Sequence, residues 1–80
     1  MTQHFTAPPG GIMTDDVGVI TGPVEARIDG DLVRIRYEGA GEEYTVTGTV
    51  GERTPDEVWE QLTTDPGVDE YDNPKHVDLQ

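Results

Sequence analysis

The chain has 80 residues, and its seventeen acidic residues against five basic ones give a formal net charge of −12. Binding to nucleic acid or to an anionic membrane would require a local reversal of this sign, so the charge argues against both. The chain has no cysteine, which excludes disulfides, thiol catalysis and zinc sites built on thiolates.

The length predicts one small domain. Hydrophobic residues make up 32% of the chain, below the roughly 45–50% of typical globular domains, a share that counts glycine. Part of the chain is therefore expected outside the core. No apolar run approaches the ~20 residues that span a bilayer, and no basic and apolar leader pattern is present. Together with the missing cysteines, these features lead us to expect a cytoplasmic protein.

The sequence predicts three parts. Residues 1–16 are expected to form an N-terminal polar tail, because Pro8-Pro9-Gly10-Gly11 cannot propagate a helix or a central strand. Residues 17–64 are expected to form a β-β-β-β-α domain. Residues 65–80 are expected to form an acidic C-terminal tail. Val77 and Leu79 alternate with polar residues there, which leaves a short edge strand as the alternative.

The first two predicted strands cover residues 17–21 and 24–29, joined by the turn Gly22-Pro23. Asp29-Gly30 then predicts a type I′ hairpin turn into a third strand, residues 31–38, because such a turn needs positive φ at both central residues. This register places Glu25 opposite Arg34. It gives the hairpin one apolar face, formed by Val24, Ala26, Ile28, Val33, Ile35 and Tyr37.

The fourth predicted strand covers residues 43–50, where β-branched residues alternate with a period of two. A two-residue Gly39-Ala40 loop would place Ile35 opposite Tyr44, and a four-residue loop would place Ile35 opposite Val46. The first register is slightly preferred because it adds an ion pair. Gly48 stands in the inward row, which indicates a bulge or a close approach of the helix.

The last predicted element is a helix over residues 55–64. Thr54, Pro55 and Glu57 form the pattern of a capping box with proline at the first helical position. Pro66 disfavours helical geometry in the residue before it and so ends the helix. Trp59 is expected to be the main apolar anchor on the sheet. The predicted fold is α+β, mainly β: a four-stranded antiparallel meander, in one version curled and barrel-like, with one C-terminal helix on one face.

The outer face of the hairpin carries the candidate binding residues Arg27, Leu32, Arg34 and Arg36. Arginine presents a planar fork that suits a carboxylate or a phosphate. The alternative is that Glu25 and Glu43 lie across from the arginines and form ordinary cross-strand ion pairs. Leu32 is out of place on a polar face, which suggests that a tail or a second copy covers it.

Asp69, Glu70 and Asp72 form a candidate acidic surface in the C-terminal part. These acids could bind a hard cation with the help of His76, but such a site would be weak without a rigid scaffold. The further oxygen ligands of a calcium loop are absent around Asp29 and Asp31, so neither a metal nor a cofactor is expected. The sequence also offers no nucleophile with a plausible base and no glycine-rich phosphate loop. We therefore expect no catalytic residues and no enzyme activity.

These observations favour a small, acidic, non-catalytic binding protein that regulates or assembles a larger protein partner, with association steered by charge. A basic partner would suit the net charge. Two alternatives remain open: a polyanion mimic of DNA that inhibits a nucleic-acid-binding protein, and a structural subunit of a homo-oligomer or particle.

Overall fold

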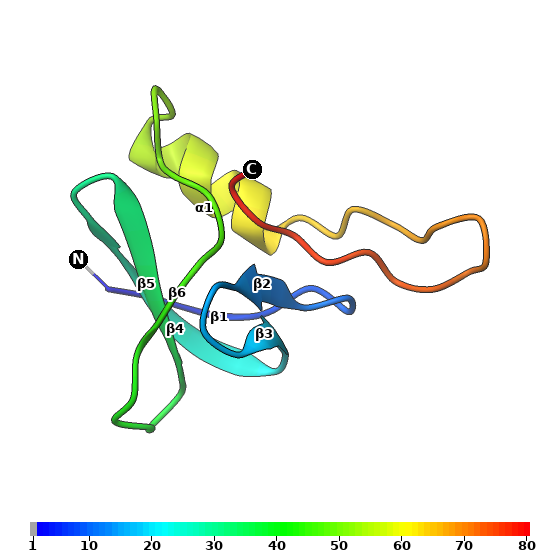
Figure 1. Cartoon of the computed structure of the whole chain (residues 1–80), viewed down its shortest axis with the longest axis horizontal. Helices are drawn as coiled ribbons and strands as arrows, with labels where there is room; N and C mark the ends of the chain where they lie inside the picture. The colour runs from blue at the N-terminus through cyan, green and yellow to red at the C-terminus, as the bar shows by residue number, and fades with distance from the viewer. Residues whose placement is uncertain (1) are drawn as a thin grey trace.

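The structure, a computed structural model, describes residues 2–80. Its elements are the strands β1 (Thr2–Thr6), β2 (Ile12–Thr14), β3 (Gly18–Ile20), β4 (Pro23–Asp29), β5 (Leu32–Tyr37) and β6 (Tyr44–Thr45), followed by the helix α1 (Pro55–Thr63). An antiparallel sheet has the strand order β1-β4-β5-β6, and β2 and β3 form a separate pair (Figure 1). The sheet is not closed into a barrel. The prediction of a mainly β fold with a four-stranded antiparallel sheet and one C-terminal helix is confirmed.

The hairpin of β4 and β5 has the predicted faces but not the predicted register. Asp29 lies opposite Leu32 and Glu25 opposite Arg36, so the turn residues are Gly30 and Asp31. Gly30 has a φ of +62°, whereas Asp29 has no positive φ. Glycine at the first turn position is the pattern of a type II′ hairpin, which does not require the left-handed conformation at an aspartate.

The strand beside β4 is not the one that the sequence predicts. We expected residues 17–21 there, but β3 pairs with β2, and β1 pairs with β4 with Phe5 opposite Val24. Phe5 packs against the core, while Val17 and Val19 are 52% and 41% exposed. The sequence of β1 is polar and therefore gives no clear strand signal. An edge strand needs few apolar residues, because only one of its faces is covered.

Most of the predicted N-terminal tail is therefore part of the fold. β1 belongs to the main sheet, β2 pairs with β3, and Ile12 of β2 is fully buried. Gly11 has a φ of +79°, and its N–H donates to the carbonyl of Pro8 over 2.8 Å, which closes the turn between β1 and β2. Met1 lies outside the described residues.

The end of the chain also packs into the domain, through isolated bridges of Val77 with Ile12 and of Leu79 with Gly48 and not through a regular edge strand. Val77 and Leu79 are buried, and the N–H of Val77 donates to the carbonyl of Gly11 over 2.9 Å. The N–H of Leu79 donates to the carbonyl of Thr47 over 2.9 Å. Gly48 has a φ of +96°, and a Cβ at this position would lie 2.4 Å from the carbonyl carbon of Leu79. The glycine thus permits a close approach of the C-terminal segment, not of the helix.

The predicted fourth strand is shorter than expected. Only β6 belongs to the sheet, in the preferred register with Ile35 opposite Tyr44. Directly afterwards, Val46 forms a bridge with Thr14, and the N–H of Thr47 donates to the carbonyl of Met13 over 3.0 Å. The chain therefore leaves the main sheet because it pairs with β2 instead.

The helix begins as predicted. The side chain of Thr54 accepts a hydrogen bond from the N–H of Glu57, and the carboxylate of Glu57 accepts one from the N–H of Thr54. Val58 and Leu62, one turn apart, are fully buried, while Trp59 is only partly buried. Trp59 packs against the core as expected, but Val58 and Leu62 are the more deeply buried contacts of the helix. Trp59 lies about 100° around the helix from Val58 and so beside the buried stripe.

Candidate functional site

The structure brings the predicted arginines together on the outer face of the hairpin. Arg27, Arg34 and Arg36 share this face with Glu25, as their alternation along β4 and β5 requires. Leu32 is 38% exposed at the turn end of the same face. The four predicted residues thus form one continuous surface.

Arg27 is held by two hydrogen bonds to the carboxylate of Glu43, from Nε over 3.1 Å and from Nη2 over 3.0 Å. This side-chain hydrogen bond raises the pKa of Arg27 and lowers the pKa of Glu43. Nη1 of Arg27 also lies 3.8 Å from a carboxylate oxygen of Asp29. The guanidinium group of Arg27 is therefore already paired with carboxylates of the same chain.

The other two arginines also have partners within the sheet. Nε of Arg36 donates to the carboxylate of Glu25, whose side chain is 13% exposed and also lies 3.3 Å from Nδ1 of His4. Nη1 of Arg34 donates to the hydroxyl of Thr45 over 2.7 Å. The cross-strand ion pairs of the alternative interpretation are present, although the real register joins Arg36 with Glu25 and Arg27 with Glu43.

The predicted acidic residues lie on an arm, residues 65–75, that projects from the body of the molecule (Figure 1). Its two sides are joined by hydrogen bonds from the N–H of Lys75 to the carbonyl of Gly67 (3.0 Å) and from the N–H of Asp69 to the carbonyl of Asn73 (2.9 Å). Val68 and Pro74 form a bridge between these bonds. The arm is therefore a narrow hairpin with a defined tip.

Asp69 builds this tip. Its Oδ1 accepts hydrogen bonds from the N–H groups of Asn73 (3.0 Å) and Tyr71 (2.8 Å), which lower the pKa of the carboxyl group. Glu70 and Asp72 are exposed beside it. The three acids are neighbours, but Asp69 holds the turn. Within residues 2–80, no group of three or more histidine, aspartate or glutamate side chains is placed to hold a metal ion.

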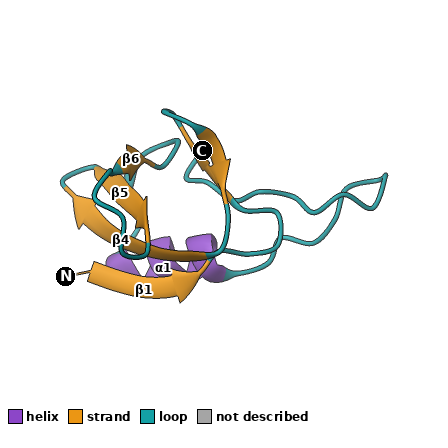
Figure 2. Ribbon diagram, turned by 90° about the horizontal axis from the view of Figure 1, so that it is seen from below, coloured by secondary structure: helices purple, strands orange, loops and turns teal. Residues whose placement is uncertain are grey.

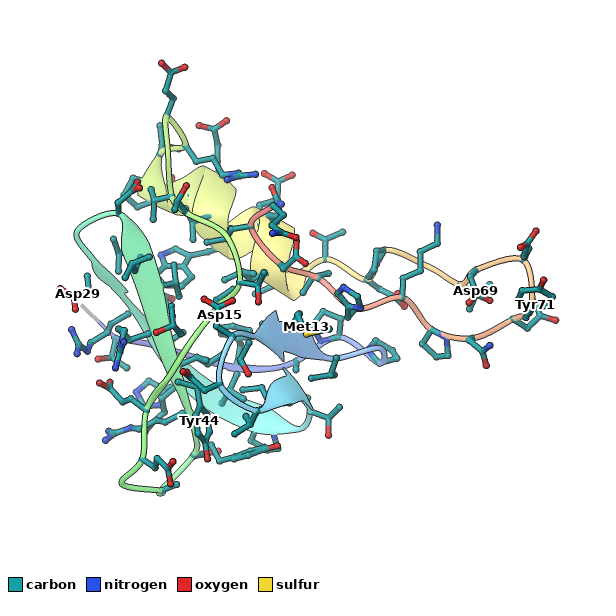
Figure 3. All side chains as sticks on the ribbon, in the orientation of Figure 1. Met13, Asp15, Asp29, Tyr44, Asp69 and Tyr71 are labelled. Atoms are coloured by element: carbon teal, nitrogen blue, oxygen red, sulfur yellow. The ribbon has the colours of Figure 1, made fainter. Side chains whose placement is uncertain are left out.

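Two surface features are absent from the sequence prediction. Tyr71, 76% exposed, stands with Asp69 at the far end of the arm (Figure 3). A groove of about 440 Å³ lies between β1 and the first turn of α1, lined by Gln3, Ile28, Pro55, Asp56 and Trp59. The place of Trp59 one position away from the helix stripe is the signal that could have indicated this groove.

The unpaired negative charge lies mainly outside the sheet. None of the ion pairs between described residues involves the arm or α1. Asp56 and Glu60 on the helix and Glu70 and Asp72 on the arm are all exposed. The helix and the arm therefore present acidic surfaces, while the outer face of the sheet is locally neutralised.

No family model, curated protein or solved structure matches this chain. In the part of the chain that the structure describes, no helix has both the length and the apolar character needed to cross a membrane.

Proposed function

We propose that this chain is a small acidic binding protein, without catalytic activity, that regulates or assembles a basic protein partner. The observation that carries the proposal is the separation of charge just described. The arginines of the outer sheet face are paired with carboxylates or a hydroxyl group of the same chain, whereas no ion pair between described residues involves the exposed carboxylates of the helix and the arm.

The net charge of −12 gives this surface a long-range field. Such a field accelerates the encounter with a positively charged partner and repels anions. The same reasoning makes a free anion an unfavourable ligand for Arg27 and Arg36, because it would have to displace Glu43 or Glu25 from hydrogen-bonded positions.

The test is capture of partners from the source lysate by the tagged full chain, with washes at about 0.1 M and 1 M salt, between which the screening length falls from about 10 Å to 3 Å. We expect a stoichiometric basic protein that remains at low salt and is lost at high salt. A partner retained at high salt, or none at either salt, would contradict the proposal. If duplex DNA displaces the chain from that partner, the role becomes that of a DNA mimic.

A further inference from the structure

The two edge strands of the main sheet differ in whether their outward backbone groups have hydrogen-bond partners. At β6, the N–H of Thr45 donates to a carboxylate oxygen of Asp16 over 2.7 Å, and the carbonyl of Thr45 accepts from the N–H of Asp15 over 2.9 Å. These contacts occupy the outward backbone groups of that edge. β1 forms the opposite edge, with β4 as its one neighbour in the sheet.

The backbone of β1 has a definite orientation. The N–H of Ala7 donates to the carbonyl of Gly22 over 2.9 Å, one step beyond the paired residues of β1 and β4. Because hydrogen-bonded pairs alternate in an antiparallel ladder, Gln3 and Phe5 also bond to β4, and the N–H and C=O groups of three residues point outward. These outward residues are Thr2, His4 and Thr6.

The sequence of β1 lacks the usual protection of a sheet edge. Natural edge strands carry lysine or other charged residues, proline or bulges that prevent another strand from pairing. β1 has the sequence Thr-Gln-His-Phe-Thr and contains no lysine, no acidic residue and no proline. All five of its residues pair in register with β4, so the strand is also free of a bulge.

The groove described above is lined by Gln3 of this edge strand and by Asp56 and Trp59 of α1. Figure 2 shows β1 as the outer strand beside β4. Gln3 lies opposite Ala26, which is buried on the face of the sheet that carries the core, and Gln3 also lines the groove. Side chains alternate between the two faces of a strand. Every second side chain of a strand added to β1 would therefore point toward Trp59 and Ile28.

We propose that the β1 edge and the Trp59 groove together bind an extended, basic segment of the partner protein by strand addition. The outward backbone groups of β1 supply the hydrogen bonds, and the groove receives apolar side chains of the segment. This inference rests on the proposed function and names its binding surface.

Charge selects the occupant. Asp56 lines the groove and is exposed, and Glu60 follows it by one helical turn on the same side of α1. A basic segment gains attraction from both. A second copy of this chain would instead bring another net charge of −12 to the edge, which opposes pairing between two copies.

The probe for this surface is a synthetic eight-residue peptide that alternates valine and lysine, titrated into the full chain. We expect saturable binding and a change in the emission of Trp59, the only tryptophan. A peptide that alternates valine and glutamate should not bind. Absence of binding by the lysine peptide would overturn the inference.

His4→Pro tests the edge itself. Proline removes one outward N–H and blocks the approach of a strand, while the hydrogen bonds of the neighbouring residues to β4 remain. The matched control is His4→Ala, which removes the same imidazole but keeps the N–H. His4→Pro should bind the lysine peptide about tenfold or more weakly than His4→Ala. Equal affinities, with circular dichroism showing both variants folded, would overturn the inference.

Asp56→Lys tests the groove without touching the core, since Asp56 is exposed. It should weaken the lysine peptide, and an unchanged affinity would count against the groove. This variant also provides the test if His4→Pro fails to fold.

Two further outcomes separate this inference from the proposed function. A basic partner that is lost at high salt but binds His4→Pro and His4→Ala equally would leave the function standing and overturn strand addition. Peptide binding at the edge without a basic partner in the lysate would overturn the function alone.

A dimer in light scattering that His4→Pro abolishes would assign the edge to a second copy and overturn the inference.

Discussion

The most direct test of the fold is Leu79→Ala, because the C-terminal segment was expected to be a solvated tail. Leu79 is 3% exposed, and its N–H bonds to Thr47. The side chain of Arg53 also donates to the carbonyl of Leu79 over 3.2 Å. A leucine buried to this extent loses about 2–5 kcal/mol on truncation to alanine, from the transfer free energy and the cavity left behind.

That loss is large for a domain of this size. At roughly 0.05–0.15 kcal/mol per residue, the whole chain has a free energy of unfolding of about 4–12 kcal/mol. Urea denaturation followed by Trp59 fluorescence should therefore show a clearly lower midpoint for Leu79→Ala. The control is Tyr71→Ala, at the exposed tip of the arm, which should change the free energy of unfolding by less than about 0.5 kcal/mol. A loss below about 1 kcal/mol for Leu79→Ala would refute the packing of this segment.

Three other substitutions probe local features. Gly48→Ala should lower the free energy of unfolding by about 1–3 kcal/mol or more in urea melts, since the φ of Gly48 is +96° and the new methyl group would meet Leu79. The control is Gly41→Ala, which has open space around it and no positive φ and should leave the free energy of unfolding unchanged. Thr54→Ala should lower it by about 1 kcal/mol through loss of the N-cap, and helicity unchanged in circular dichroism together with unchanged stability would argue against this cap. Hydrogen bonds from Thr54 lower the pKa of Glu57, so this carboxylate stabilises the fold above its ordinary pKa and ceases to do so as the pH falls through the lowered value. The stability difference between the wild type and Glu57→Gln should therefore be largest near neutral pH and shrink in acid; a difference that is independent of pH would contradict this origin.

Features with strong local signals could be predicted from the sequence. The capping box at Thr54 is a short-range pattern that predicts the helix. The glycine at position 30 predicts a hairpin with the observed faces, although the turn residues are Gly30 and Asp31 instead of Asp29 and Gly30. The observed hairpin register differs from the predicted one because residues 29–31 fit two turns: a type I′ turn at Asp29-Gly30 and a type II′ turn at Gly30-Asp31. In the observed turn, Asp31 makes two long-range contacts: its carbonyl accepts from the N–H of Val50 over 2.7 Å, and its carboxylate accepts from the N–H of Gly51 over 2.9 Å.

Features that depend on long-range pairing could not be predicted. β1 is polar and the segment around Leu79 is short. β1 is a strand because β4 pairs with it, and Val77 and Leu79 form isolated bridges because Ile12 and Gly48 lie beside them. Gly48 did signal a close approach, but the sequence alone could not identify the segment that approaches it. Tertiary context outweighs intrinsic strand preference in such places.

The candidate site shows the same division. The arginines of the sheet could be placed on one face by alternation alone, whereas their partners depended on a register that the sequence did not determine. The groove at Trp59 combines residues from β1, β4 and α1, which only the folded chain brings together. No local pattern encodes such a surface.

The central claim is that charge steers this chain to a basic partner. The measurement that tests it most directly is the association rate constant with the captured partner, followed by stopped-flow fluorescence as salt rises from about 0.05 to 0.5 M. We expect a fast association at low salt, on the order of 10⁷ M⁻¹s⁻¹ or above, and a fall toward about 10⁵–10⁶ M⁻¹s⁻¹ as salt screens the charge of the chain. A rate constant that does not change with salt would contradict it.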